Sequence, residues 1–289
     1  RCCRPGSRLH ARRASRRHHD HRGARGCRFL RWHGSHSESQ KNHRLGHRHG
    51  VPAPRKRGRA LQQGGDAIEA GPIQGEGGFI VPAPGFLRTL SAWCRANGIV
   101  MVADEVQSGI ARTGKWFASE WEEGFEPDLI TVAKGIAGGM PLSGVVGRAE
   151  IMDASHAGGL GGTFGGSPTA TAAGVAVLEQ IEEGGWLERA LEIETVLMSR
   201  LSELKSQYPV IGDLRGKGAM IAIELVEPGT KTPNSAAVDA LVKHCHQNGV
   251  LILNAGTYNN VIRFLPPLAI TDELLNDAMD VLAAGLAKL

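Results

Sequence analysis

The chain has 289 residues and a formal net charge of +4, and 42% of its residues are hydrophobic. This length allows one large or two ordinary domains, and the apolar share is sufficient for a sizeable core. No apolar run reaches the roughly 18 residues of a membrane span, so we expect no transmembrane helix and no membrane partner. The start of the chain does not resemble a signal peptide, and its first residue is arginine rather than methionine, so we expect a fragment.

The charge is divided unevenly along the chain. Residues 1–65 hold 18 of the 33 basic residues and only two of the 29 acidic residues, Asp20 and Glu38. This segment therefore carries a net charge of +16, and the remaining residues carry −12. The basic overall balance does not describe the globular part, which has the acidic composition of an ordinary soluble body.

Residues 1–65 contain few apolar side chains and show no helical or strand period, so we expect disorder. Three interpretations stay open. The arginines suit the phosphates of a nucleic acid, and Cys2, Cys3 and Cys27 suit a metal ion, although their spacing matches no recognisable ligand set. The dominance of Arg, His, Gly, Pro and Ser favours the third, an out-of-frame reading of a GC-rich gene. We therefore expect neither a nucleic acid nor a metal as a partner.

The chain has five cysteines, an odd number, and contains no CxxC motif. Cys94 and Cys245 both lie in segments with a helical pattern. We interpret them as reduced structural thiols of a cytoplasmic protein.

From residue 66 onward, helical and strand patterns alternate. The segment 84–98 has apolar residues on one helical face and ends at a glycine, which suits a helix stop. The segments 99–105 and 128–134 are apolar runs typical of buried strands. Helices between strands favour a mostly parallel, doubly wound sheet.

Two further helices are predicted at 168–183 and 186–207, and beyond them the pattern changes to short strands. The short strands and their two accompanying helices are predicted within the ranges 219–225, 249–256, 260–267, 235–248 and 272–288. We therefore expect a basic segment at 1–65, a large α/β domain at 66–210 and a small α+β domain at 211–289.

A single lysine, Lys134, follows the apolar run 129–133 and is followed by Gly135, Gly138 and Gly139. Most lysines beside a strand are ordinary surface residues. Here the strand is apolar throughout, the glycines let a ligand approach the backbone, and ligands of open α/β sheets lie beyond the carboxyl ends of strands. Lys134 is therefore a candidate nucleophile.

Asp104 and Glu105 follow the other apolar run in the same way. Taken alone, either acid is equally well explained as a cap of the next turn. An aspartate together with Lys134 is the pair that pyridoxal 5'-phosphate requires, because the lysine holds this cofactor covalently and the carboxylate keeps its ring nitrogen protonated.

Two long segments carry a family resemblance, VMVADEVQSGIARTGKWFASE at 100–120 and PDLITVAKGIAGGMPLSGVVGRAEIMD at 127–153. They strongly resemble the pyridoxal-phosphate signature of the class III aminotransferases, and the likeness extends over about 72–289. The resemblance implies the α/β fold of a fold-type-I aminotransferase, with an incomplete, mostly parallel large-domain sheet, a small C-terminal α+β domain, bound pyridoxal 5'-phosphate and a homodimer.

The resemblance also implies roles for individual residues. Lys134 matches the lysine that holds the cofactor and carries the proton, and Asp104 matches the partner of the ring nitrogen. Val106 matches a residue that packs on the ring face, and Gln107 matches one near the phenolic oxygen of the ring. Thr163 matches the hydroxyl that reaches the cofactor phosphate of the other subunit, although the glycines around it are equally typical of a flexible loop.

The resemblance also implies that two charged residues act in substrate binding. Arg263 matches the arginine that grips the α-carboxylate of glutamate, and Glu76 matches its switchable partner, which neutralises the guanidinium when no α-carboxylate is present. Within the class, this likeness is to the members that move the amino group of 4-aminobutyrate to 2-oxoglutarate. An ω-aminotransferase of the ornithine or acetylornithine type is the alternative, and an inert remnant whose basic arm binds nucleic acid is a further one.

The likeness fails upstream of about residue 72. The family supplies the first strands, a phosphate-binding turn, a stacking aromatic ring and an arginine for the distal carboxylate in that region, and residues 1–65 contain none of these in a recognisable motif. Gly71 stands where the family has an acid, and Glu69 is displaced by two positions. We therefore expect a truncated or frameshifted chain with impaired turnover and an exposed strand edge that promotes aggregation.

Overall fold

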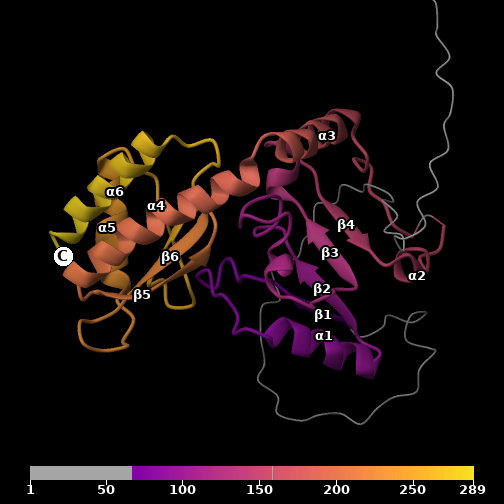
Figure 1. Ribbon diagram of the computed structural model, residues 1–289, viewed down its shortest axis with the longest axis horizontal. Helices are drawn as coiled ribbons and strands as arrows, with labels where there is room; N and C mark the ends of the chain where they lie inside the picture. Colours follow the sequence, from indigo (N-terminus) through magenta and orange to yellow (C-terminus); the bar gives the residue numbers. More distant parts are fainter. Residues whose placement is uncertain (1–66, 158) are drawn as a thin grey trace, which may run out of the picture.

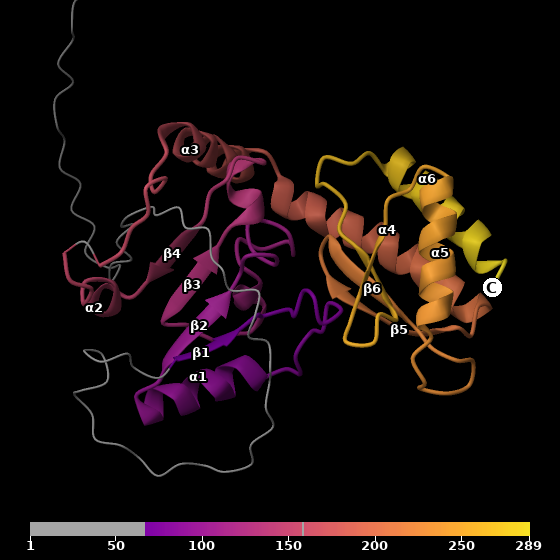
Figure 2. The ribbon, with the colours of Figure 1, turned by 180° about the vertical axis from the view of Figure 1, so that it is seen from behind.

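The structure is a computed structural model that describes residues 67–157 and 159–289. The interpretations of residues 1–65, including those of Cys2, Cys3 and Cys27, lie outside the described residues. The described chain forms two lobes that lie side by side, each built on its own sheet (Figures 1 and 2). Helix α4 (Trp186–Gln207) begins near the N-terminal lobe and extends across the C-terminal lobe.

The N-terminal lobe contains a four-stranded sheet in the order β1-β2-β3-β4. The first three strands are parallel, and β4 is antiparallel to β3, so the expected mostly parallel sheet is confirmed. The carboxyl ends of β2 and β3 meet at one edge, where Asp104 lies opposite Thr131 in the register. The strands are β1 (Ala67–Ala70), β2 (Val100–Asp104), β3 (Leu129–Val132) and β4 (Gly144–Gly147).

Two longer helices pack on this sheet and its loops. Helix α1 (Phe86–Asn97) places Leu87 and Cys94 against the inner residues of β2, and it ends at Gly98, whose φ of 69° suits glycine. Helix α3 (Pro168–Glu183) packs beside the turn that begins at Lys134. The shorter elements of this lobe are η3 (Ala118–Trp121), η4 (Lys134–Ala137) and α2 (Ala149–Met152).

The C-terminal lobe contains an antiparallel sheet in the order β5-β6-β8-β7, covered by α4, α5 and α6. Fully buried side chains from α4, such as Ile193 and Leu197, meet Ile223 and Ile262 of the sheet in one continuous core. The elements are β5 (Ile211–Lys217), β6 (Met220–Leu225), α5 (Ser235–Gln247), β7 (Leu253–Ala255), β8 (Val261–Phe264) and α6 (Asp272–Leu286).

The five helices and strands predicted between residues 84 and 207, and the two predicted C-terminal helices, are present within a few residues of the expected bounds. Strands β4 and β5 were not predicted. The segment of β4 is only Gly-Val-Val-Gly, and β5 is interrupted by two glycines and a register shift between Ile211 and Asp213. The strand predicted within 249–256 is reduced to the three residues of β7.

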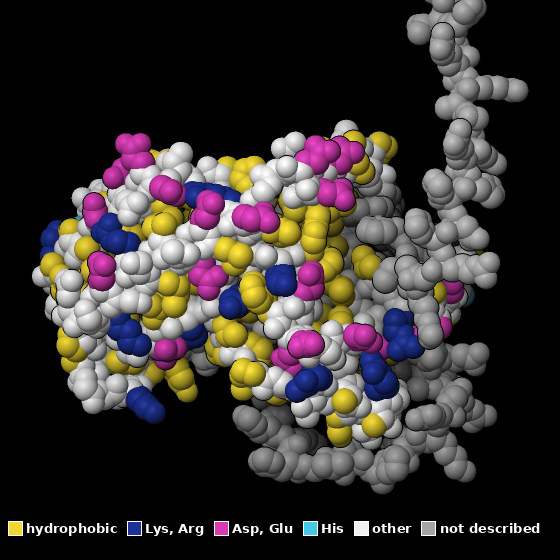
Figure 3. Space-filling view, in the orientation of Figure 1, with side chains coloured by type: hydrophobic (Ala, Val, Ile, Leu, Met, Phe, Trp, Pro, Cys, Tyr) yellow, Lys and Arg dark blue, Asp and Glu magenta, His cyan; other side chains and the backbone are white. Residues whose placement is uncertain are grey.

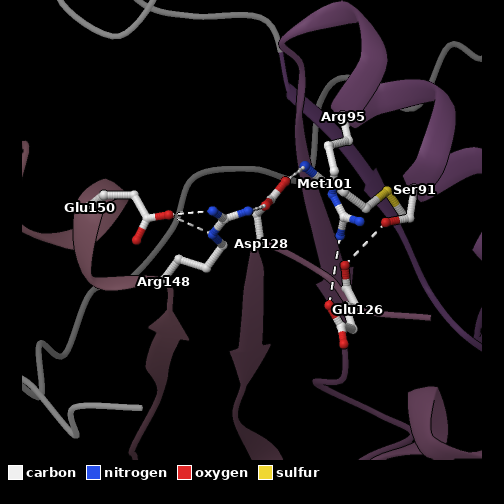
Figure 4. A network of polar contacts seen from close by, with 7 residues as sticks. All are labelled: Ser91, Arg95, Met101, Glu126, Asp128, Arg148 and Glu150. Atoms are coloured by element: carbon white, nitrogen blue, oxygen red, sulfur yellow. Dashed lines mark hydrogen bonds and ion pairs between the residues drawn. The ribbon is translucent and has the colours of Figure 1, made fainter. Parts of the chain in front are cut away.

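A polar network ties the sheet together at the edge opposite the carboxyl ends (Figure 4). Asp128, just before β3, accepts a hydrogen bond from the backbone N–H of Met101 at 2.9 Å and pairs with Arg148, which follows β4, at 3.0 Å. Arg148 also pairs with Glu150. These contacts fasten the starts of β2 and β3 to the end of β4, so this edge has a structural role.

The expected reduced thiols are confirmed for Cys94 and Cys245, which are both free and buried. Burial raises the pKa of the Cys245 thiol to about 11 and also raises the pKa of Cys94. Acidic and basic side chains are interspersed over the face of the molecule seen in Figure 3. Within residues 67–157 and 159–289, no helix combines the length and the apolar character that a membrane crossing requires.

Candidate active site

Lys134 and Asp104 lie at the same edge of the N-terminal sheet. Asp104 is the last residue of β2, and Lys134 follows the neighbouring parallel strand β3 after one alanine and opens the turn η4. Because parallel strands bring their carboxyl ends together, the two residues share the edge at which open α/β sheets bind ligands.

The carboxylate of Asp104 is held in place by its own neighbourhood. Its Oδ1 accepts hydrogen bonds from the backbone N–H of Val106 at 3.0 Å and from the hydroxyl of Thr131 at 3.3 Å. No donor in the part of the chain that the structure describes reaches the other oxygen, Oδ2. Asp104 is half-buried, and this oxygen is left for a cationic N–H donor.

Glu105, the next residue, has a different role. It is completely buried, and its two oxygens accept hydrogen bonds from the hydroxyls of Ser108 and Ser119 and from the backbone N–H groups of Ala118 and Ser119. With its acceptors occupied in this way, Glu105 fastens the loop after β2 to η3. Of these two neighbouring acids, only Asp104 has a carboxylate oxygen that accepts no hydrogen bond from the described residues.

The backbone at the edge is strained. Lys134 has a φ of 52°, in the left-handed region that lysine rarely occupies, and Ile110 and Ala111 in the facing loop have φ values of 57° and 66°. Such conformations cost about 1–3 kcal/mol each and persist where the surroundings enforce them. Ile110 and Ala111 are buried in one apolar cluster with Val132, which holds the two strained segments against each other.

The C-terminal lobe contributes Arg263, from β8, to the same site. Its Nη1 lies 2.6 Å from Oε1 of Glu76, which is carried by a loop of the N-terminal lobe. Oε1 of Glu76 also accepts a hydrogen bond from the amide of Gln107 at 3.3 Å. The Arg263 side chain is 15% exposed and that of Glu76 is 76% exposed. The hydrogen bond from Arg263, aided by Gln107 and Lys134, lowers the pKa of Glu76 against the opposing effect of burial.

One cavity of about 670 Å³ brings these residues together. Its walls include Glu76, Gln107 and Lys134 from the N-terminal lobe and Arg263 from the C-terminal lobe. Four of the seven residues predicted for the site therefore line one cavity between the lobes, whereas Asp104 is not among its lining residues. The remainder of the wall is largely apolar.

Val106 and Thr163 lie apart from these four residues. Val106 is half-buried between Asp104 and Gln107 on the loop after β2. Thr163 is exposed and lines a separate cavity of about 850 Å³, next to Phe164, whose side chain is 81% exposed. Thr163 therefore does not join the cavity of Lys134 within one chain.

The residues of the edge fit a pyridoxal phosphate ring. Oε1 of Gln107 is buried, and no donor among the described residues satisfies it, so Gln107, which lines the same cavity as Lys134, retains an unused polar atom. Asp104 likewise offers a free oxygen to a ring nitrogen. The glycine after Lys134 leaves room, because a Cβ built on Gly135 would meet nothing closer than Ile110 at 3.9 Å.

Two arginines that the sequence did not single out connect the lobes. Arg112 donates to the carbonyl oxygens of Pro266 at 2.6 Å and Ala219 at 3.4 Å, and burial lowers the pKa of its guanidinium to about 10. Arg215 donates to the carbonyl oxygen of Gly78 at 2.9 Å. Each sits in a motif of the form Arg-Thr-Gly or Arg-Gly, and nothing in such short motifs indicates which backbone they reach.

Comparisons with known proteins identify the family of this chain. The family described as "Aminotransferase class-III" matches residues 66–286. The 4-aminobutyrate aminotransferase of Mycobacterium tuberculosis is 56% identical over 225 residues, which are 77% of this chain and 50% of that protein. The 5-aminovalerate aminotransferase of Pseudomonas putida is 48% identical over 223 residues, 77% of this chain and 52% of that protein.

Solved structures give the same result for the fold. The ornithine aminotransferase of Toxoplasma gondii, solved with partial occupancy of pyridoxal phosphate at its active site, aligns with a TM-score of 0.70 at 33% identity. The alignment covers 80% of this chain and 53% of that structure. The chain belongs to the class III aminotransferase family, and it spans about half the length of the relatives that it matches.

Proposed function

We propose that this chain acts in the pyridoxal-phosphate-dependent transfer of the amino group of 4-aminobutyrate to 2-oxoglutarate, giving succinate semialdehyde and glutamate. The observation that carries the proposal is the ion pair between Arg263 and Glu76, 2.6 Å long, in the cavity that Lys134 lines. This pair gives the site a guanidinium for a carboxylate together with a built-in replacement for that carboxylate.

The proposed cofactor contacts come from one edge of the sheet. Lys134 would hold the cofactor, Asp104 would accept a hydrogen bond from its ring nitrogen, Val106 would pack on the ring face, and Gln107 would lie by the phenolic oxygen. When bound, pyridoxal phosphate supplies an electron sink for the electrons of a breaking substrate C–H bond. Lys134 Nζ moves the proton of that bond, because it lies in the same cavity as the substrate-binding pair.

The Arg263–Glu76 pair suits an enzyme with two unlike substrates. Glutamate and 2-oxoglutarate carry a carboxylate next to the reacting carbon, and Arg263 binds it with the planar fork of its guanidinium. 4-Aminobutyrate has no carboxylate at that position, and an unpaired, largely buried guanidinium is costly. Glu76 then neutralises Arg263, and its exposed position lets it move aside when the other substrate arrives.

The names of the relatives support an ω-amino acid as the donor and leave its length open. They include 4-aminobutyrate, 5-aminovalerate and ornithine aminotransferases. All three donors place the reacting amine on a carbon without an adjacent carboxylate, so Glu76 and Arg263 serve each of them equally. The high identity to 4-aminobutyrate aminotransferases, 56%, is the reason to place 4-aminobutyrate first.

The test is a half-reaction with purified chain loaded with pyridoxal phosphate. Each amino donor is added separately, and the loss of the visible band of the cofactor is followed together with the aldehyde product. We expect the rate to fall in the order 4-aminobutyrate, 5-aminovalerate, ornithine. A faster reaction with ornithine would replace the proposed donor, and no reaction with any ω-amino acid would contradict the proposal.

We further propose a homodimer in which Thr163 reaches the cofactor phosphate of the partner subunit. The support is that Thr163 lies in a different cavity from Lys134, beside an exposed phenylalanine. Mixing two defective variants tests this. A mixed dimer of Lys134→Ala and Thr163→Val contains one site with both residues intact, so cofactor binding is expected to recover in up to half of the sites. No recovery in a confirmed mixed dimer would contradict the proposal.

A further inference from the structure

Glu76 lies in a loop formed by residues 74–80, and the two ends of this loop are joined to each other. Gln74 and Ile80 close the loop with two backbone hydrogen bonds of 3.0 and 3.2 Å. Phe79 is completely buried in a cluster that includes Met220 and Val261 of the C-terminal lobe. The Glu76 side chain itself is largely exposed. Its position against Arg263 therefore depends on what fixes the backbone between Gly75 and Gly78.

Arg215, on β5, makes a side-chain hydrogen bond to the backbone of this part of the loop. Its Nε donates to the carbonyl oxygen of Gly78 at 2.9 Å, and its side chain is only 17% exposed. Gly78 has a φ of 103°, and a Cβ placed on it would stand 3.1 Å from Nη2 of Arg215 and 3.0 Å from Val261. The loop thus turns tightly against the guanidinium at a position where only glycine fits comfortably.

The guanidinium of Arg215 is itself held firmly. Its Nη1 lies 2.7 Å from Oδ2 of Asp213 and 2.6 Å from Oε2 of Glu224. The other oxygen of Glu224 accepts a hydrogen bond from the amide of Asn260 at 3.2 Å. Asn260 is 2% exposed and directly precedes the strand that carries Arg263.

These contacts form one continuous path between the two members of the ion pair. From Glu76 the path runs through Gly78 to Arg215, and from there through Glu224 and Asn260 to the strand of Arg263. A second tie supports it, because the backbone N–H of Gly256 donates to the carbonyl oxygen of Glu76 at 3.0 Å. The C-terminal lobe therefore holds the loop by its backbone while leaving the carboxylate of Glu76 free to move.

We propose that Arg215 is a positioning residue that sets the Glu76–Arg263 pair, so that Glu76 returns to Arg263 whenever the cavity holds no carboxylate beside it. The positional part of this inference stands on the contacts alone. Its consequence for substrate choice rests on the proposed function. Arg215 touches neither Arg263 nor the carboxylate of Glu76, so it acts only through the loop.

Three variants distinguish an effect on the position of the loop from an effect of the charge of Arg215 and from a general loss of stability. Arg215→Met removes both the charge and the donor, and Arg215→Lys keeps the charge near Asp213 and Glu224 but lacks the Nε that reaches Gly78. Arg189→Met is the matched control. Arg189 also pairs with two carboxylates and one carbonyl oxygen, at 2.7 to 2.9 Å, and is 20% exposed, but it joins α4 to the start of α6.

The primary measurement is the titration of the Glu76 carboxyl by carbon NMR in the chain without cofactor, with Glu76→Gln to assign the signal. The charged and polar groups that face Glu76 are Arg263, Gln107 and Lys134, and together they lower its pKa. We expect Arg215→Met and Arg215→Lys to raise the pKa of Glu76 by at least about half a unit toward the ordinary value. We expect Arg189→Met to leave it unchanged.

An unchanged Glu76 titration in either folded Arg215 variant, or an equal shift in Arg189→Met, would overturn the positioning role. Should Arg215→Met fail to fold, Arg215→Lys decides, because it retains the ion pairs with Asp213 and Glu224.

The second measurement is the half-reaction. Arg215→Lys is expected to raise the KM for 4-aminobutyrate about tenfold, roughly the effect of one lost hydrogen bond to a charged group, and to change the KM for glutamate much less. Equal effects on both donors would overturn the specificity part. A shifted Glu76 titration in a chain that reacts with no ω-amino donor would support the positioning role and refute the proposed function, so the two fail separately.

Discussion

The two lobes bury their sheets to different degrees. In β6 of the C-terminal lobe, every residue except Glu224 is buried, whereas in β3 of the N-terminal lobe only Val132 is buried. Helices α4, α5 and α6 cover the C-terminal sheet and close its core. The N-terminal sheet keeps apolar side chains half-exposed along β1 and β3. The C-terminal lobe is therefore a closed unit, and the site lies where the less closed lobe meets it.

The largest expected effect is on the free energy of unfolding, and it is tested at two matched isoleucines. Ile223 of β6 is completely buried, and Ile130 of β3 is half-buried. Ile223→Ala should lower the free energy of unfolding by about 4 kcal/mol and Ile130→Ala by about 1–2 kcal/mol, because a cavity costs more where the surroundings are closely packed. Urea denaturation of both variants measures the difference, and equal losses would show that the two cores are equally closed.

The two buried thiols provide a second comparison. Cys245 lies in the large C-terminal core, and Cys94 lies in the smaller cluster beneath α1. With the pKa of Cys245 raised to about 11, about one thiol in a thousand is ionised at pH 8, so labelling requires opening of the core. We expect Cys94 to be alkylated at least about tenfold faster, as read by mass spectrometry of the peptides. Faster labelling of Cys245 would indicate that the C-terminal lobe opens more readily than the N-terminal lobe, which would contradict the account.

The strained lysine gives a smaller effect. At a φ of 52°, glycine is favoured over alanine by about 1 kcal/mol, so Lys134→Gly should be more stable than Lys134→Ala by that amount. Lys217, at the end of β5, is the control, because glycine in a strand is less stable than alanine. Thermal unfolding of the four variants tests the opposite signs. The same sign at both positions would mean that the backbone at Lys134 is unstrained.

The smallest expected effect is the pH dependence of the stability that Glu76 contributes. The pKa of Glu76 is lowered in the folded chain, mainly by the hydrogen bond from Arg263, so its contribution to stability is present above its ordinary pKa of 4.5 and is lost as the pH falls through the folded value. Because Glu76 is largely exposed, this contribution is at most about 1 kcal/mol. The stability difference between wild type and Glu76→Gln should exist at pH 7 and vanish near pH 3. A difference that grows at low pH would have the wrong sign.

The regular elements of the fold were largely predictable from the sequence because their apolar periods are strong. The helices at 168–183 and 186–207 match α3 and α4 in both bounds. The missed strands show the limit of this approach. In β4 and β5 the glycines and charged residues remove the period, and pairing with the neighbouring strand, rather than local preference, makes them strands.

The sequence indicated candidate residues for the site, and the structure brings Glu76, Gln107, Lys134 and Arg263 to one cavity, but their geometry could not be predicted. The placement of Lys134 and Asp104 follows from the end of each parallel strand. The left-handed backbone of Lys134 does not follow, since lysine gives no sign of it. The path through Arg215, Glu224 and Asn260 is equally hard to predict, because it joins positions distant in the sequence through one backbone carbonyl group and three side chains.

The visible absorbance spectrum of the purified chain with pyridoxal phosphate, measured beside Lys134→Ala, tests the central claim most directly. The claim is that the carboxyl ends of β2 and β3 form the cofactor site. A visible band that appears with the wild-type chain and disappears in a folded Lys134→Ala variant is the expected result. The same spectrum from both proteins, with or without a band, would contradict the claim that Lys134 holds the cofactor.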